Sequence, residues 1–168
     1  MRRAKTALLA LVAALAVGCK SQADASPEPG PSASAAAPTP KGKMRLVNAP
    51  AEGDVDTLVR SAEDAAMKER RRVVVYVGAK WCEPCQRFHH AAERGELDAK
   101  FPDVDIVGFD ADKDAERLAS AGYVSKLIPL FALPGPDGRA SGKQVEGGIK
   151  GEGAVGFIAP RLEKMLAE

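Results

Sequence analysis

The stretch that decides the fold is Val73-Val74-Val75-Tyr76-Val77-Gly78-Ala79-Lys80-Trp81-Cys82-Glu83-Pro84-Cys85. Its first part, residues 73–77, is a continuous run of β-branched and aromatic side chains, which is typical of a strand buried on both faces of a sheet. A Cys-x-x-Cys pair follows that strand directly and opens a predicted helix over residues 83–94. Domains held together by structural disulfides space their cysteines far apart, so this close pair favours thiol chemistry.

Outward from the pair, strands and helices alternate and then end in a hairpin and a helix. This order predicts an α/β sandwich with a central mixed β-sheet flanked by helices. Pro160 lies inside the last helical pattern and predicts a kink or a late start there. In chain order the predicted elements are helix 54–72, strand 73–77, helix 83–94, strand 104–110, helix 113–121, strand 129–133, turn 134–142, edge strand 144–148 and helix 152–167.

The Trp-Cys-x-Pro-Cys core in this setting resembles the thioredoxin superfamily, over roughly residues 55–166. The resemblance implies a thiol–disulfide oxidoreductase in which Cys82 is the nucleophile and Cys85 resolves the mixed disulfide. It also implies a cis bond before Pro129, with Pro129 and the backbone of Ile128 binding the client chain and Trp81 covering the cysteines. The implied partners are client proteins with thiols or disulfides and an upstream redox donor or acceptor protein; no cofactor and no metal are expected.

The helix N-terminus is the physical basis for reactivity at Cys82, because free N–H groups and the helix dipole stabilise a thiolate there. We therefore expect Cys82 to be exposed and Cys85, one turn further along, to be buried. Pro84 stiffens the first turn without losing a needed N–H. The cation of Lys80 favours the thiolate, whereas the charge of Glu83 opposes it.

Two residues depart from the pattern of the resembled family. Tyr76 stands six residues ahead of the first cysteine, where many thioredoxins carry a buried acid that moves a proton during resolution. With an ordinary pKa near 10, Tyr76 is a poor base, so Glu83, another acid or water must serve instead. Leu130 replaces the usual threonine after the proline, which leaves substrate preference open.

The N-terminus predicts export and lipidation. Three basic residues among the first five precede an uncharged run over residues 6–17, which is too short for a membrane span of roughly 20 residues and is typical of a secretory signal. The stretch Leu15-Ala16-Val17-Gly18-Cys19 then resembles a bacterial lipobox. Several acyl chains on Cys19 would hold the protein stably at a membrane, facing the periplasm. Lys20 follows that cysteine, and by resemblance to the sorting of enterobacterial lipoproteins the absence of aspartate there implies the outer membrane.

Three segments follow from this interpretation: a signal peptide over residues 1–18, a lipidated Ala/Pro/Ser tether over 19–44, and one folded domain over 45–168. Without the three basic residues of the signal, 21 basic and 23 acidic residues remain, a net charge of about −2. This ordinary surface gives no reason to expect nucleic acid as a partner.

Other interpretations of the cysteine pair stay open at this point. The pair could be a structural disulfide, or it could bind a metal together with His89 or His90, although zinc usually takes four ligands. His89 is otherwise expected to be an ordinary residue of the helix surface. Gln86 after the second cysteine excludes covalent haem attachment, which needs histidine there. The alternative function is a lipoprotein that binds a metal or a partner protein through these cysteines without turnover.

Overall fold

The computed structural model describes residues 42–168; the predicted signal, the lipidation site Cys19 and the tether up to residue 41 lie outside the described residues. The strands are β1 (Arg45–Asn48), β2 (Arg72–Gly78), β3 (Val104–Asp110), β4 (Leu130–Pro134) and β5 (Ala140–Glu146). They form a five-stranded sheet in the order β1-β3-β2-β4-β5. β1 and β2 run parallel to β3, whereas β4 runs antiparallel to β2 and to β5, so the predicted mixed sheet is confirmed.

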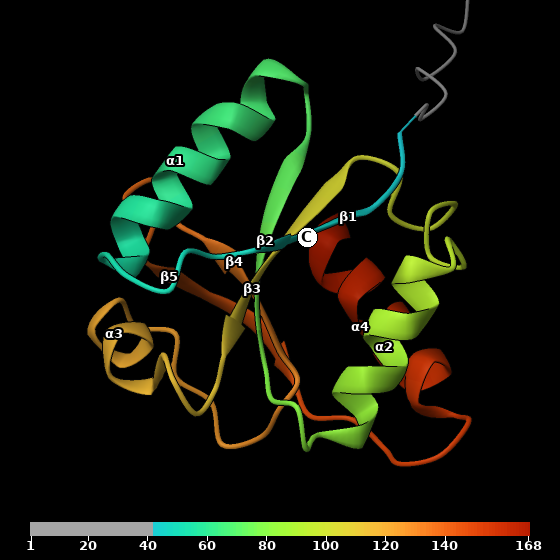
Figure 1. Ribbon diagram of the computed structural model, residues 1–168. Coiled ribbons are helices and arrows are strands. Elements are labelled where there is room, and N and C mark those ends of the chain that lie inside the picture. Colours follow the sequence, from blue (N-terminus) through green and yellow to red (C-terminus); the bar gives the residue numbers. More distant parts are fainter. Residues whose placement is uncertain (1–41) are drawn as a thin grey trace, which may run out of the picture. The chain divides into compact units, whose positions relative to one another are not determined.

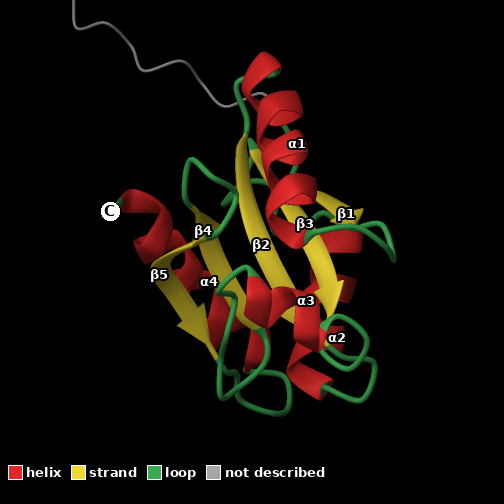
Figure 2. Cartoon of the chain, turned by 90° about the vertical axis from the view of Figure 1, so that its left-hand side faces the viewer, coloured by secondary structure: helices red, strands yellow, loops and turns green. Residues whose placement is uncertain are grey.

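Helices cover both faces of this sheet (Figures 1 and 2). One face carries α1 (Val55–Lys68) and α3 (Ala115–Ser120), and the other carries α2 (Glu83–Glu93) and α4 (Ala154–Ala167). β2 lies in the middle of the sheet and alternates between the two cores. Val74 and Tyr76 face the α2 and α4 side, while the valines at positions 73, 75 and 77 face the α1 and α3 side. The cysteine pair follows the carboxyl end of this central strand.

β1 was missing from the predicted order of elements. It spans only four residues, and none of them is fully buried, so the periodic signal in the sequence is weak. What fixes β1 is its partner, because Arg45 donates hydrogen bonds from Nε and Nη2 to the Asp105 carboxylate of β3 at 2.7 and 2.5 Å. Met44 is buried in the core as well, so the folded domain begins before residue 45, within the predicted tether.

Several element boundaries also differ from those predicted. α1 ends at Lys68, and not at residue 72, because Arg70 adopts a left-handed conformation with φ 59° and Arg72 already belongs to β2. β5 begins at Ala140, inside the segment assigned to a turn. α4 begins at Ala154 and continues through Pro160, which lies on its exposed side.

Candidate functional site

The two cysteines lie at the junction between the end of β2 and the start of α2. Cys82 is the N-cap of α2, and its Sγ accepts a hydrogen bond of 3.3 Å from the backbone N–H of Cys85. The two sulfur atoms form a disulfide of 2.00 Å, with the Cα atoms 5.2 Å apart. The sulfur of Cys82 therefore sits at the positive end of the helix dipole, facing a backbone donor.

The predicted difference in exposure between the two cysteines is wrong for this disulfide form. Cys82 is 4% exposed and Cys85 is 2% exposed, so both are buried. The reason is local, because Sγ of Cys82 turns back over the first helical turn toward the N–H of Cys85 instead of pointing outward. The position of Cys82 ahead of the helix, next to the exposed Trp81, is what still distinguishes the two cysteines.

The first turn of α2 is held by a close approach of the loop before α4. Pro84 is buried at the second position of the helix, where its missing N–H costs no hydrogen bond. Gly148 packs on its ring so closely that a Cβ at residue 148 would lie 2.7 Å from the Pro84 Cβ. Only glycine fits there, so this loop is a fixed neighbour of the disulfide.

Pro129 lies at the start of β4, beside the end of β2. The Ile128–Pro129 peptide bond is cis, as the resemblance implied. Leu130 pairs with Val77 in the antiparallel register, which places Pro129 next to Gly78, close to the point where the chain turns toward the cysteines. Ile128 precedes β4, so its backbone lies outside the strand pairing of the sheet. The residue is half-buried.

A mixed sheet of this order, a Cys-x-x-Cys disulfide opening the helix after its central strand, and a cis proline at the next strand together decide the fold. The domain has a thioredoxin-like fold. No protein-family model matches the chain, and no curated protein matches it.

Solved thioredoxins are similar to the chain in structure. Thioredoxin NaTrxh from Nicotiana alata shares 22% identity, and the match covers 74% of this chain and 92% of that one with a TM-score of 0.48. Spinach chloroplast thioredoxin f shares 23% identity over 76% and 88% of the two chains, with a TM-score of 0.45. A poplar thioredoxin h shares 20% identity over 75% and 95%, with a TM-score of 0.43. At these identities the likeness concerns the fold alone.

Trp81 of this thioredoxin-like domain is an exposed side chain held in place by a distant residue. It is 69% exposed, and its indole N–H donates a hydrogen bond of 2.9 Å to Asp112 Oδ2 in the loop after β3. Asp112 could not be found from the sequence, because 31 residues separate the partners and no local pattern joins them. Lys80 is exposed beside Trp81, and its carbonyl oxygen accepts a hydrogen bond from the side chain of Gln86.

Glu83 is paired, and this changes its expected effect on the thiolate. Its Oε1 accepts hydrogen bonds from Arg87 Nε at 3.0 Å and from the backbone N–H of Gly151 at 3.1 Å. The Arg87 hydrogen bond, followed by the one from Gly151, lowers the pKa of Glu83. Glu83 is thus an ionised partner of Arg87 at neutral pH. It is therefore unsuited to take the proton of Cys85 during resolution, the role for which it was one candidate.

Tyr76 is an apolar packing residue in the thioredoxin-like core. Burial raises its pKa well above the ordinary value, so it cannot act as a base near neutral pH. Its ring stacks on Phe88 at 6.2 Å and lies tilted against Phe131 at 5.2 Å between ring centroids. The hydroxyl covers Gly78, where a Cβ would lie 2.1 Å from the oxygen.

His89 is the residue whose predicted setting changes most. It was expected on the open surface of α2, yet it is half-buried, with its ring edge-on to Tyr76 at 4.9 Å between centroids. Both rings line a cavity of about 540 Å³, and Cys85 lines the same cavity. The reason is helical spacing, because residues four apart share one face of a helix.

Two further observations bear on other site chemistries. Within residues 42–168, no group of three or more His, Cys, Asp or Glu side chains is arranged to hold a metal ion. In the same residues, no helix is both long enough and apolar enough to cross a membrane.

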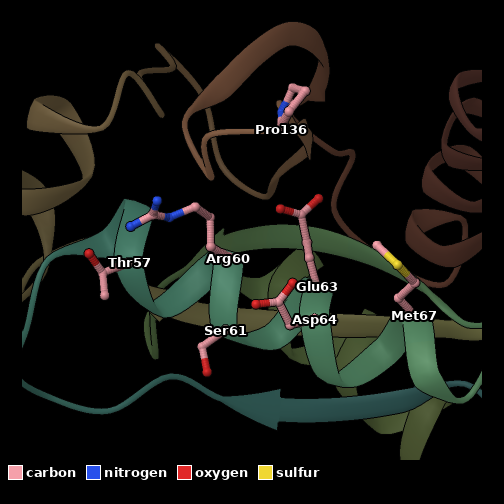
Figure 3. A pocket seen from close by; sticks show the side chains of 7 residues that line it. All are labelled: Thr57, Arg60, Ser61, Glu63, Asp64, Met67 and Pro136. Atoms are coloured by element: carbon pink, nitrogen blue, oxygen red, sulfur yellow. The ribbon is translucent and has the colours of Figure 1, made fainter.

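A separate cavity of about 480 Å³ lies on the other face of the sheet, along α1 (Figure 3). Glu63 and Asp64 come from the helix, and Pro136 comes from the turn between β4 and β5. Burial, followed by the charges of Asp64 and Asp137, raises the pKa of Glu63. No cysteine or histidine lines this cavity, whereas Cys82 and Cys85 belong to the core on the α2 and α4 side of the sheet.

Proposed function

We propose that this protein is an extracytoplasmic thiol–disulfide oxidoreductase that exchanges disulfides with client proteins through Cys82 and Cys85. The observation that carries the proposal is the disulfide between these residues at the N-terminus of α2. A sulfur at the N-cap, with a backbone donor 3.3 Å away, is favoured as a thiolate. A second sulfur within bonding reach allows release of the client without a large motion.

The exchange has two steps that balance. In the reduced form, the Cys82 thiolate attacks a client disulfide, forms a mixed disulfide, and releases the other client sulfur as a thiolate that takes up a proton. Cys85 then loses its proton and attacks Sγ of Cys82, which breaks the mixed disulfide and releases the second client thiol. The client gains two electrons, and the protein ends as the Cys82–Cys85 disulfide; the reverse sequence oxidises a dithiol client.

Apolar side chains around the disulfide support a protein client. Trp81 adjoins Cys82 in the chain, and Leu127 and Ile149 are exposed, with Ile149 directly after Gly148, which packs on Pro84. Leu127 reaches Gly147, because a Cβ at residue 147 would lie 3.1 Å from Leu127 Cδ1. An extended client segment laid over this surface would meet the half-buried residue Ile128, in line with its implied role and that of Pro129.

The same proposal includes export and anchoring through a lipidated Cys19, on the strength of the lipobox-like sequence. The described part of the domain suits such an anchor. The chain enters β1 at Arg45, at the amino ends of the parallel strands β1, β3 and β2, whereas the cysteine pair follows the carboxyl end of β2. An anchor ahead of Met44 would leave the carboxyl ends of these strands, and the disulfide beside them, free to meet clients.

Turnover tests the function. The wild-type protein should reduce insulin disulfides with a thiol donor, and Cys82→Ser should abolish this activity. Cys85→Ser should accumulate mixed disulfides through Cys82, because the resolving sulfur is gone, whereas Cys82→Ser should accumulate few. Stoichiometric binding of copper or zinc without any turnover would instead support a metal-binding lipoprotein. Acyl chains on Cys19, found by mass analysis of the membrane fraction, would test the anchor separately.

A further inference from the structure

The resolving step needs a group that takes the proton of Cys85, and neither Glu83 nor Tyr76 supplies it. Glu83 is tied to Arg87 and to the backbone of Gly151. Tyr76 is buried, with a raised pKa. The acceptor must therefore come from the cavity of about 540 Å³ that reaches Cys85 from the side of β1 and β3.

His89 is placed for this proton transfer. It follows Cys85 by four residues in α2, so the two Cβ atoms lie about 5–6 Å apart on one helical face. The edge-on contact with Tyr76 at 4.9 Å holds the imidazole against the wall of the cavity. Both Cys85 and His89 line this space, which is large enough for several water molecules between them.

The ring nitrogens of His89 are free to exchange protons. Among the hydrogen bonds of residues 42–168, none involves this ring, and no buried side-chain nitrogen or oxygen in that part of the chain lacks a partner. The nitrogens are therefore accessible to solvent from the cavity that the ring lines. Burial lowers the pKa of His89, the charge of Glu93 raises it in part, and His90 lowers it further. The neutral imidazole, which can accept a proton, is thus the main form at neutral pH.

Of the three carboxylates that line the cavity, Asp110 and Asp114 accept hydrogen bonds from other groups, and Glu93 lies eight residues beyond Cys85, about two helical turns further along α2. Asp110 Oδ1 accepts hydrogen bonds from the backbone N–H groups of Asp112 and Lys113, at 2.9 and 3.2 Å. Asp114 accepts hydrogen bonds from Arg117 and from the backbone of Asp110. The other charged or titratable side chains that line the cavity are Lys80, His90, Glu93 and Lys113.

We propose that His89 accepts the proton of the Cys85 thiol through cavity water during resolution of the mixed disulfide; this inference rests on the proposed function. The proton moves from Cys85 Sγ to an imidazole nitrogen, and the Cys85 thiolate attacks Cys82 Sγ. The bond between Cys82 and the client sulfur breaks, and the client thiolate leaves with the electron pair. Histidinium then returns the proton to the leaving thiolate or to solvent. In the oxidising direction the same imidazole, as histidinium, protonates Cys85.

Single-turnover kinetics on the full chain test this inference. The reduced protein reacts with the aromatic disulfide DTNB, which releases one thionitrobenzoate when Cys82 attacks and a second when Cys85 resolves the adduct. In the wild type, the pH midpoint of the second release should coincide with the pKa of His89 measured by NMR. His89→Asn should slow the second release at neutral pH by about tenfold to a hundredfold, at the low end of general-base effects, and should remove that midpoint. Added imidazole should restore part of the rate.

His90→Asn is the matched control, because His90 is the exposed neighbour on the same helix. His90 also lines the cavity and lowers the pKa of His89, so this variant should keep a fast second release while its pH midpoint moves upward together with the pKa of His89. Neither variant should change the release by Cys82. His89→Gln repeats the test if His89→Asn does not fold. An unchanged rate and pH profile in the folded variant would overturn the role of His89, as would a wild-type midpoint that differs from the pKa of His89. Absence of any second release in the wild type would instead contradict the function of the cysteine pair.

Discussion

Asp105 is predicted to hold β1, the outer strand that the sequence did not predict, against the rest of the sheet. Its carboxylate accepts hydrogen bonds from Arg45 of β1 and, at 2.7 Å, from Arg71 Nε ahead of β2. The side chains of Asp105 and Arg71 are 8% and 7% exposed. Asp105→Asn removes the charge but keeps the size, and therefore leaves the buried guanidinium of Arg71 without its buried counter-ion.

The expected loss follows from the burial of this pair. Breaking a buried ion pair by removing one partner costs about 3–5 kcal/mol. Arg71 keeps hydrogen bonds to the carbonyl oxygens of Lys43 at 2.6 Å and Val104 at 3.0 Å, so the lower end of about 3 kcal/mol applies. With a urea m-value of about 2 kcal/mol/M, the unfolding midpoint should fall by about 1.5 M. The melting temperature should fall by about 12 °C for a domain of this size.

Asp103→Asn is the control for this experiment. Asp103 faces the same Arg71 at 3.8 Å, but its side chain is 45% exposed, so its loss should cost less than about 1 kcal/mol. Disulfide exchange per folded molecule should not change in either variant, because both residues lie at the amino end of β3, whereas the cysteines follow the carboxyl end of the parallel strand β2. If Asp105→Asn destabilises the protein no more than Asp103→Asn does, the buried pair does not hold β1, and the reasoning is refuted.

The same pair predicts an acid limit to stability. Burial acts to raise the pKa of Asp105, but the hydrogen bonds from Arg45 and Arg71 outweigh it and hold this pKa below its ordinary value. The stabilisation is therefore complete above the unfolded-state pKa of about 3.9 and is lost as the pH falls through the lower folded-state value. Asp105→Asn should remove this step from a plot of unfolding free energy against pH.

Three further predictions concern the site. Glu83→Gln removes a negative charge at the N-terminus of α2, while Arg87 keeps its ion pair with Glu152 at 2.6 Å. It should lower the pKa of the Cys82 thiol by less than about one unit, since exposed charges interact weakly; thiolate absorbance against pH measures this, and an unchanged pKa would show that Glu83 does not act on the sulfur. Phe88→Ala removes a fully buried ring that packs on Phe131 with centroids 4.7 Å apart; denaturant unfolding should show a loss of about 3–5 kcal/mol, and a loss below 1 kcal/mol would contradict this packing. Because burial lowers the pKa of His89, the unfolded chain binds this proton first, so stability should decline as the pH falls below about 6.5 toward the folded-state pKa; His89→Asn should flatten that slope, and an equal slope in both proteins would place the titration elsewhere.

The predicted sandwich follows from contiguous signals, which is why the sequence could supply it. Residues 73–77 are a continuous apolar run, and residues 104–110 carry four large apolar side chains; both became central strands, the second with the predicted bounds. β1 lacks such a run, since its four residues gain their place from pairing with β3 and from the ion pair of Arg45 with Asp105. A contact across 60 residues leaves no trace in local periodicity.

The site divides in the same way. The positions of Cys82 and Cys85 follow from the order of strand and helix, but their joint burial depends on the direction in which Cys82 Sγ turns. The spacing of Cys85 and His89 was available in the sequence as one helical turn. The cavity between them was not, because its far wall comes from the ends of β1 and β3. Asp112 was likewise hidden, since only the folded chain brings it to Trp81.

The most direct test of the central claim is a redox titration of the full chain in glutathione buffers, with the free thiols counted at each ratio. A reversible oxidoreductase should show one two-electron transition between a Cys82–Cys85 dithiol and disulfide, and this transition should vanish in both Cys82→Ser and Cys85→Ser. The midpoint fixes the direction of electron flow, since about 30 mV corresponds to ~1.4 kcal/mol for this couple. A pair that stays oxidised in every glutathione buffer, or that never forms the disulfide, would contradict the account.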